Sequence, residues 1–523
     1  MNIEDIQQYL PKNVKVEICG NIAFFEVPAL HIKEIATNLH ANKNLPLHLI
    51  TATDERAEKE GFKIWYVFGI SKKNMFVVPF IRLQNTVTFP SLTPAIHSAC
   101  NFEKKIHTFF GLTPVLHPDL RPIILHENWP ANLFPLRKDF DWQTKVKEIH
   151  GTYQFQKVEG EGIYEIPVGP IHAGIIEPGH FRFSVAGEEI MLLEAKLGFV
   201  HKGSEKLFET LPLSNKLRLC EKISGDSSFS HSLAFCQAAE QLSDALPPKR
   251  ALYLRVIYAE LERLANHFGD IGAIMIDTGF NFGGANGARL REMIMQINER
   301  LTKSRFLRNV NTIGGVTKDI NAKEIIVLGK DLEKIQKDFF EIIAIAQNSA
   351  SLLNRLKGTG VLLPKTAKDY GALGVAAKAV GILSDIRVDF PYAAYDELGF
   401  NTIETESGGD VYARFRVRVK EVYASMNLIQ NALTKLPKGP ILTPRNTTVF
   451  KKNALAIGMV EGWRGQIIYV ITTDLAGNIS RVAPCDPSFL NWSLVGEAGP
   501  LNVVPDFPLI NKSFNLSYSG NDL

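Results

Sequence analysis

Two kinds of hydrophobic pattern divide this sequence. Residues 63–69 (KIWYVFG) and 74–83 (NMFVVPFIRL) are rich in β-branched and aromatic residues and lie on either side of a polar turn. Residues 181–185 alternate between apolar and polar positions, as in a half-buried strand, and residues 465–473 (GQIIYVITT) alternate as well. A turn and a further short β-rich stretch, 479–482, follow. The sequence therefore predicts strands in its N-terminal part, after residue 180 and near its C-terminus.

Apolar residues at helical spacing dominate the middle of the chain. One stripe consists of Ile257, Leu261, Leu264 and Phe268, and a second of Phe415, Val419, Val422, Met426, Ile429 and Leu433. Residues 95–110 and 233–242 are also helical in pattern, and residues 324–356 predict one long helix or two shorter ones. A bundle is the natural way to bury several such stripes. The glycine-rich segment 279–287 (GFNFGGANG) is expected to be a structural turn ahead of a helix that starts near residue 288.

These patterns predict an α+β fold in two domains. Residues 1–140 are expected to form an N-terminal α+β domain. Residues 166–523 are expected to form a mainly α-helical bundle domain with β-hairpins near its start and end. Between them, residues 141–165 are polar and aperiodic and include three glycines, which is typical of a linker. A chain of 523 residues is in any case too long for one ordinary core.

Composition restricts the classes of function. The chain has 45% hydrophobic and 22% charged residues, as globular proteins do, and its net charge of +3 gives no reason to expect a nucleic-acid partner. Its five cysteines share no repeated spacing, which argues against a disulfide framework and suits a reducing cytoplasm. No run of about eighteen apolar residues is present, so no membrane span is predicted. Any membrane role must therefore come through partners.

The strongest candidate for chemistry lies between residues 169 and 240. Gly, Pro and His punctuate residues 169–180 (GPIHAGIIEPGH), which predicts a tight loop. Residues 224–231 (SGDSSFSH) precede or enter the predicted helix at 233–242, where backbone amides and side chains can face a buried site. Taken alone, a histidine at a helix start more often has a structural role.

These same residues carry a family resemblance. Residues 169–185, 197–207 (LGFVHKGSEKL) and 224–240 together resemble the large subunit of membrane-bound [NiFe] hydrogenases of the hydrogenase-4 and formate hydrogenlyase type. That large subunit is related to the D-type subunit of NADH-quinone oxidoreductase, respiratory complex I. Residues 109–121 and 135–140 resemble the C-terminal signature of the C-type subunit of complex I, an extended tail that contacts its neighbours. The resemblance thus implies that a C-like and a D-like region are fused in one chain.

The resemblance places the nickel-ligand positions on residues that cannot provide thiolates. Aligning His231 puts the first Cys-x-x-Cys pair on Ser224 and Ser227, and the second pair falls on Ser517 and Gly520. A serine hydroxyl is a hard donor that stays protonated near neutral pH, whereas this site requires thiolate sulfur. We therefore expect no metal and no [NiFe] centre. Ser224, Ser227, His231 and Ser517 are expected to line the former metal or quinone cavity.

Quinone chemistry is the second possibility that the resemblance implies. In complex I a loop histidine binds the quinone head group and pairs with an aspartate, which here corresponds to Asp277, with His180 or His172 as the histidine. A histidine beside a carboxylate can donate a proton to a developing quinol oxygen and be reprotonated at neutral pH. The tyrosine that holds the other quinone oxygen falls near Gly225, and no tyrosine occurs between residues 219 and 235. This departure weakens the quinone hypothesis.

Four charged residues share one predicted helix. Arg255, Glu260, Arg263 and His267 are spaced as in the corresponding helix of both families. They form either a solvated face or internal ion pairs, and both roles are commoner than catalysis. The resemblance also allows a role in coupling to an ion-pumping module.

Two hypotheses follow. In the first, the chain is an oxidoreductase subunit that takes electrons from an iron-sulfur partner and passes them to quinone or an unidentified acceptor, coupled to ion translocation. The expected partners are an iron-sulfur small subunit resembling the B-type subunit of complex I, further iron-sulfur subunits, and membrane-embedded ion-translocating subunits. NADH, if it is the donor, would be oxidised elsewhere. The complex would lie on the inner face of the cell membrane.

In the rival hypothesis, the chain is a catalytically silent structural subunit that retains only the interfaces.

Overall fold

A five-stranded sheet forms the N-terminal part of the molecule. The computed structural model describes residues 6–11, 14–174, 176–444 and 449–523. The strand order is β1-β2-β5-β4-β3. These strands are β1 (Val16–Cys19), β2 (Ile22–Glu26), β3 (Leu47–Glu55), β4 (Gly61–Ile70) and β5 (Met75–Leu83). Helix α1 (Ile32–Thr37) contacts β5, and α2 (Cys100–Phe110) contacts β3. Two short strands, β6 (Thr88–Pro90) and β7 (Thr113–Val115), pair in parallel.

The hairpin predicted in this part is confirmed, whereas the helix predicted over residues 95–110 is shorter than expected. Strands β4 and β5 pair antiparallel, with Ile70 opposite Met75. The helix begins only at Cys100, after a 3₁₀ turn. The carboxylate of Glu103 in this helix accepts hydrogen bonds from the Leu92 amide and from the Ser91 and Thr93 hydroxyls. Those bonds hold the preceding segment in a turn.

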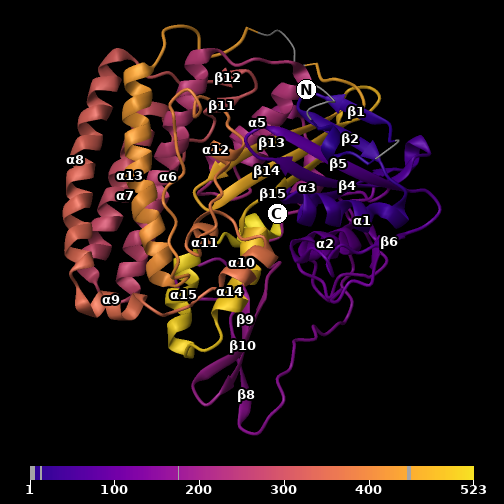
Figure 1. The fold of residues 1–523 in the computed structure, drawn as a ribbon, viewed down its shortest axis with the longest axis horizontal. Coiled ribbons are helices and arrows are strands. Elements are labelled where there is room, and N and C mark those ends of the chain that lie inside the picture. Colours follow the sequence, from indigo (N-terminus) through magenta and orange to yellow (C-terminus); the bar gives the residue numbers. More distant parts are fainter. Residues whose placement is uncertain (1–5, 12–13, 175, 445–448) are drawn as a thin grey trace.

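A projecting three-stranded sheet follows a long irregular segment. Residues 116–162 form no helix or strand, and every one of them is described. Strands β8 (Ile163–Val168), β9 (His180–Ala186) and β10 (Glu189–Lys196) then pair antiparallel in the order β10-β9-β8, at the lower edge of the view in Figure 1. The strand predicted at 181–185 is therefore confirmed, but it is not half-buried. Ser184, on the face opposite Phe183, is also buried in this central strand.

The bundle is built from long helices that lie side by side on the left in Figure 1. Its long members are α6 (Lys249–Asp277), α7 (Asn281–Thr302), α8 (Ala322–Gln347) and α13 (Val411–Lys435). The helical stretch predicted over 324–356 is two helices, because α9 (Ala350–Leu356) begins anew with Ser349 as its N-cap. The shorter helices in this part of the chain are α3 (Ser204–Thr210), α4 (Leu213–Cys220), α5 (Ser228–Ser243), α10 (Pro364–Tyr370), α11 (Gly374–Lys378) and α12 (Ile386–Asp389). A short pair, β11 (Asn311–Thr312) and β12 (Gly315–Val316), follows α7.

The C-terminal sheet lies between the bundle and the N-terminal sheet (Figure 1). It comprises β13 (Leu455–Gly462), β14 (Gly465–Thr473) and β15 (Ile479–Cys485), in that order. The predicted strands 465–473 and 479–482 are thus confirmed. Three helices end the chain: α14 (Ser488–Ala498), α15 (Phe507–Phe514) and α16 (Tyr518–Asp522). The α+β fold class predicted from the sequence is confirmed, with the strand-rich part first and the helical part after it.

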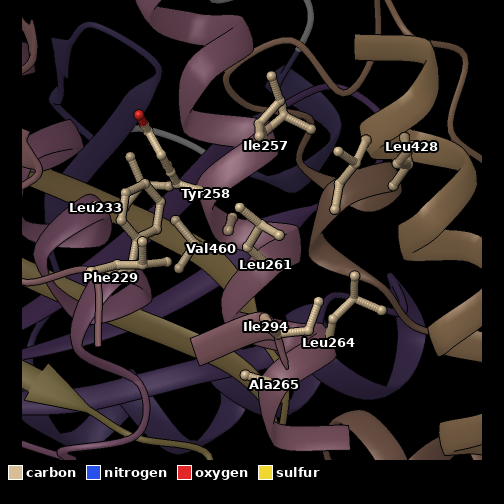
Figure 2. Close-up of a cluster of buried hydrophobic side chains, with 14 of the residues drawn as sticks. Phe229, Leu233, Ile257, Tyr258, Leu261, Leu264, Ala265, Ile294, Leu428 and Val460 are labelled. Carbon is tan, nitrogen blue, oxygen red and sulfur yellow. The ribbon is translucent and has the colours of Figure 1, made fainter. Parts of the chain in front are cut away.

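Helix α6 is the centre of the larger core. Its predicted apolar stripe is buried, and Ile257, Leu261 and Leu264 lie beside Leu428 of α13 and Val460 of β13 in Figure 2. A second core joins the N-terminal sheet to the C-terminal one. Across that junction, buried His48 Nδ1 lies 2.6 Å from Gln466 Oε1. The C-terminal sheet therefore contributes apolar side chains to both cores. Among the residues that the structure describes, no helix is long and apolar enough to cross a membrane.

The glycine-rich segment 279–287 does not form the expected turn. Helix α7 begins at Asn281, so most of these glycines lie inside its first two turns. They allow α7 to approach α6 closely: a Cβ added to Gly287 would lie 2.6 Å from the Cα of Gly272, and one on Gly284 would lie 2.1 Å from the side chain of Ile276. Close backbone contact between two helices thus explains the glycines, which had been interpreted as turn residues.

This contact predicts opposite effects for two glycine-to-alanine substitutions. Gly287→Ala should lower the melting temperature, because forcing a methyl group against the backbone of α6 costs about 1–3 kcal/mol. Gly329→Ala is the matched control, since Gly329 lies inside α8 with no atom within 4 Å of the added Cβ. That variant should be more stable by roughly 0.5–1 kcal/mol. Thermal unfolding of both variants tests the packing, and equal melting temperatures would contradict it.

Candidate functional site

The two segments that correspond to the nickel-ligand positions meet in the structure. Ser224 lies in the turn before α5, and Ser517 precedes α16 near the C-terminus. Their hydroxyl oxygens are 2.9 Å apart, and both side chains are buried. Ser517 also caps α16, since its hydroxyl accepts a hydrogen bond from the Gly520 amide. The structure thus brings together Ser224 and Ser517, two of the residues expected from the sequence to line one site.

An ion pair closes this site on one side. Asp226 accepts two short hydrogen bonds from the Arg464 guanidinium, at 2.7 and 2.8 Å. The hydroxyls of Ser224 and Ser227 lie 2.8 and 3.3 Å from the same carboxylate. Burial alone would raise the pKa of Asp226, but Arg464 and these hydroxyls lower it to about 2. The carboxylate is consequently ionised and fully engaged at neutral pH.

His231 is held by two hydrogen bonds. Its Nε2 lies 3.0 Å from Asp486 Oδ2, and its Nδ1 lies 3.0 Å from the Tyr469 hydroxyl. Burial would raise the pKa of Asp486, but the bonds from His231 and the charge of Arg464 hold it below its ordinary value. Because both ring nitrogens are occupied, His231 has no free lone pair for a ligand. Neither Asp486 nor Tyr469 was among the residues predicted from the sequence.

Asp486 also occupies the space beside the fourth ligand position. A Cβ added to Gly520 would lie 2.7 Å from the Asp486 carboxyl carbon and 2.8 Å from its Oδ2. Glycine at position 520 is therefore required by the aspartate that faces it. Across the described part of the chain, no group of three or more His, Cys, Asp or Glu side chains is arranged to hold a metal ion. The residues present do not fit a nickel-iron centre.

The loop 169–180 contacts this site through α16. Glu177 Oε2 accepts a hydrogen bond from the Ser519 amide, and Gly179 packs against the ring of Tyr518, whose Cε1 would lie 2.5 Å from an added Cβ. The predicted loop histidines bond to backbone atoms of the same loop. His172 Nε2 lies 2.7 Å from the Gly179 carbonyl oxygen, and His180 Nδ1 lies 3.4 Å from that of Gly169.

His180 has the more enclosed environment of the two histidines. It is the first residue of β9, and its ring packs 5.2 Å from that of Phe155. Burial lowers the pKa of His180, and the nearby Arg182 guanidinium adds to this effect. The imidazole is therefore neutral at pH 7, so it must receive a proton before it can donate one.

Asp277 lies at the C-terminal end of α6 and is engaged elsewhere. Its Oδ1 accepts a hydrogen bond of 2.8 Å from Lys512 of α15. Within residues 6–11, 14–174, 176–444 and 449–523, no hydrogen bond joins Asp277 to His172 or His180. The pairing of a loop histidine with Asp277 stays a prediction.

The charged residues of α6 form internal ion pairs, and the alternative of a solvated face is wrong. Glu260, Arg263 and His267 are all buried, and so is Arg255. Arg255 pairs with Glu240 of α5 at 2.6 Å, whereas the other three join a larger cluster with residues of α11, α12, α13 and β13. The helical spacing of these α6 residues is visible in the sequence. The partners that Glu260, Arg263 and His267 have on other elements, however, lie more than a hundred residues away along the chain.

Comparison with known proteins agrees with this arrangement. Residues 25–146 match the family described as the respiratory-chain NADH dehydrogenase 30 Kd subunit, and residues 277–457 match that of its 49 Kd subunit. Formate hydrogenlyase subunit 5 of Escherichia coli (strain K12) is 31% identical over 94% of this chain and 87% of its own length. Hydrogenase-4 component G of the same strain is 32% identical, over 99% and 89% respectively.

A third relative comes from the respiratory enzymes. The C/D subunit of NADH-quinone oxidoreductase from Phocaeicola vulgatus is 29% identical over 84% of this chain and 88% of its own length. All three relatives match across the 30 Kd-like and the 49 Kd-like parts, as the residues quoted for the resemblance predicted. The chain belongs to the family of complex I-like and hydrogenase-4-like subunits that includes formate hydrogenlyase subunit 5 and hydrogenase-4 component G.

Proposed function

We propose that this chain is a subunit of a membrane-associated oxidoreductase complex and that it works without a nickel-iron centre. The observation that carries the proposal is the contact between Ser224 and Ser517, whose hydroxyls meet at 2.9 Å where the family resemblance places two metal ligands. Hydroxyls, an Arg464–Asp226 ion pair and the His231–Asp486 pair satisfy one another there. A hydrogen-bonded cluster replaces the thiolate donors that nickel needs.

In this proposal the chain receives electrons from an iron-sulfur partner and passes them to quinone or another acceptor. Support comes from the loop 169–180, which contains His172 and His180 and contacts α16 through the hydrogen bond from the Ser519 amide to Glu177. A histidine in such a loop can hold and donate a proton as an acceptor is reduced. The relative from Phocaeicola vulgatus is named as an NADH-quinone oxidoreductase subunit, which points to the same class of acceptor.

The proposed partners and location follow from the relatives. We propose that residues 1–140 form the C-like domain, 141–165 the linker and 166–523 the D-like domain, and that an iron-sulfur small subunit resembling the B-type subunit of complex I binds the D-like domain. A relative from Pyrococcus furiosus is named as the alpha subunit of a membrane-bound hydrogenase. By analogy, membrane-embedded ion-translocating subunits would hold this chain at the inner face of the cell membrane, and electron transfer would be coupled to ion movement.

A structural role is the second candidate function, and one contact favours it. Asp277, the proposed partner of the quinone-contacting histidine, forms an ion pair with Lys512, while both loop histidines bond to backbone carbonyls. The two histidine contacts stabilise the loop, and the Asp277–Lys512 ion pair engages the carboxylate that a proton-donating histidine would pair with. In this alternative the chain retains the interfaces of its family and carries no chemistry.

The absence of a nickel centre predicts the metal content of the complex. The complex purified with its natural partners should contain iron from the iron-sulfur partner but substoichiometric nickel, because hard hydroxyl donors do not bind it in place of thiolates. Metal analysis and a hydrogen-uptake assay on one preparation provide the check. A nickel-containing hydrogenase treated identically is the control. Stoichiometric nickel together with hydrogen uptake would overturn the proposal.

The role of His180 predicts a loss of quinone reduction on substitution. His180→Ala should lower kcat for quinone reduction by about 10²–10⁴-fold, the usual contribution of a general acid, if the ring supplies the proton. His150→Ala is the control, since His150 is an exposed histidine in the linker. Both variants are measured in the assembled complex.

The outcomes separate the two candidate functions. Quinone reduction that falls with His180→Ala and not with His150→Ala supports the oxidoreductase. Equal rates in both variants would exclude His180 as the proton donor. A wild-type complex that reduces no quinone and takes up no hydrogen would leave the structural subunit as the better account.

A further inference from the structure

A cluster of buried ionisable side chains lies at the centre of the larger domain. Five elements contribute to it: α6, α11, α12 with its preceding residue, α13 and β13. Its eight members are Glu260, Arg263, His267, Lys378, Asp385, Arg387, Glu421 and Glu461. Each is at most 3% exposed. We call these eight residues the charge cluster.

Glu421 connects most of the cluster. Its carboxylate accepts hydrogen bonds of 2.7 Å from both Lys378 and His267, and it lies 3.4 Å from Arg263. Because His267 donates from Nε2, the ring needs no second proton to make this bond. Burial lowers the pKa of His267, although the bond to Glu421 partly offsets this effect. His267 is consequently neutral at pH 7.

The remaining contacts pair every cation with a carboxylate. Asp385 lies 2.8 Å from Lys378 and 2.7 Å from Arg387. Glu260 lies 3.1 Å from Arg263 and 3.2 Å from Arg387, and the hydroxyls of Tyr395 and Ser425 also bond to it at 2.6 Å. Arginine and lysine supply three positive charges, and Asp385, Glu260 and Glu421 supply three negative ones. The cluster is therefore electrically neutral before Glu461 is counted.

Glu461 is the carboxylate without a cation of its own. Its Oε2 accepts a hydrogen bond from the Ile386 amide, whereas its Oε1 has only Lys378, at 3.5 Å, and accepts no hydrogen bond from the described residues. Lys378 already donates to two other carboxylates. Burial raises the pKa of Glu461 to about 7, and the charge of Asp385 adds to this effect. An ionised Glu461 would leave a net negative charge in a site closed to water.

The charge cluster is connected through one aromatic ring to the serine site, the group formed by Ser224, Ser227, Ser517 and Asp226. His267 lies edge-on to Trp463, with ring centroids 6.1 Å apart, and the Arg464 guanidinium lies over the same indole at 3.9 Å from its centroid. Arg464 in turn binds Asp226. In the part of the chain that the structure describes, His267 Nδ1 and Trp463 Nε1 are both buried without a hydrogen-bond partner. The lone pair of His267 Nδ1 can accept a hydrogen bond or a proton, whereas the Trp463 indole N–H can only donate.

We propose that the charge cluster is a proton-binding site, in which the Glu461 carboxyl holds one exchangeable proton next to the serine site. Binding this proton keeps the cluster neutral, and releasing it creates one uncompensated buried charge. The inference goes beyond the proposed function, because it concerns a site of its own and holds whichever acceptor the complex reduces.

The groups around Glu461 fix the range in which it titrates. Lys378, Arg387 and Arg263 favour the anion, while Asp385 opposes it. On its own strand, the Glu461 amide donates to the Tyr392 hydroxyl, which burial keeps protonated by raising its pKa. Asp389, beside Asp385, is only partly buried and faces Lys72. Among the eight members of the cluster, Glu461 is therefore the one that exchanges a proton near pH 7.

Infrared spectroscopy of the purified complex tests the site directly. A protonated carboxyl has a C=O stretching band that disappears on ionisation, so the band intensity is followed between about pH 5 and about pH 9. The wild type should lose intensity around pH 7, and Glu461→Gln should remove one of the titrating components. Glu262→Gln is the matched control, because burial raises the pKa of that carboxyl to about 7 as well. It should remove a separate component and leave that of Glu461 in place.

Each spectroscopic outcome decides the proposal. A component that vanishes in Glu461→Gln and persists in Glu262→Gln supports it. A pH difference spectrum of Glu461→Gln that equals the wild type would overturn it. If Glu461→Gln fails to assemble, Glu461→Asp retains the carboxyl and should show the component with a shifted midpoint. Its absence from Glu461→Asp would also overturn the proposal.

The same proton predicts how stability changes with pH. In the folded chain the Glu461 carboxyl has a pKa of about 7, above the value of 4.5 in the unfolded chain. The bound proton therefore stabilises the folded state at low pH, and this stabilisation is lost as the pH rises from 4.5 to about 7. The wild-type melting temperature should therefore fall between these two values more steeply than that of Glu461→Gln. Parallel slopes in the two proteins would contradict the proposed site.

Discussion

Burial of charge around α6 is the constraint on which the structure depends. Ionised side chains can be removed from water only when partners of opposite charge lie at hydrogen-bond distance. Here those partners come from α11, α12, α13 and β13, which are remote from α6 in the chain. The cluster therefore fixes how the bundle and the C-terminal sheet sit against each other. Removing one member would leave its partner charged and unpaired, which is far more destabilising than losing an exposed pair.

The serine site likewise depends on polar groups that pair with one another. The four positions that the resemblance assigns to metal ligands are Ser224, Ser227, Ser517 and Gly520, which carry hydroxyls or no side chain. Asp226 and Arg464 neutralise each other, and Asp486 is held by His231 and the Ser488 amide. Gly520 leaves room for the aspartate. Where the family resemblance places soft ligands, this chain has a set of mutually satisfied polar groups, connected to the charge cluster through Trp463 and Arg464.

Much of the fold could be predicted from local pattern. The hairpin of β4 and β5, the long helices α6 and α13 and the strands near the C-terminus have clear periodicity, and each forms as expected. The predictions that were wrong failed because of tertiary packing, which local pattern does not reveal. The glycines near residue 284 serve contact with α6, and Ser184 of β9 is buried although it lies on the face opposite Phe183.

The site was predictable only where motifs marked it. Ser224 and Ser517 could be paired because each stands where the family has a cysteine, although they are 293 residues apart. Asp486, Tyr469 and Arg464 lack such a signal, since an aspartate after a strand or an arginine in a turn is ordinary until its partner is known. Likewise, the helical spacing of Glu260 and Arg263 marks one helix face, but only the tertiary contacts show that this face is buried.

The most direct test of the central claim is a high-resolution structure of the complex with its natural partners. The account predicts the Ser224 and Ser517 hydroxyl oxygens at hydrogen-bond distance, with the Asp486 carboxylate against Gly520 and no strong peak between these residues. A strong peak coordinated by these residues, with anomalous signal at the nickel absorption edge, would contradict it.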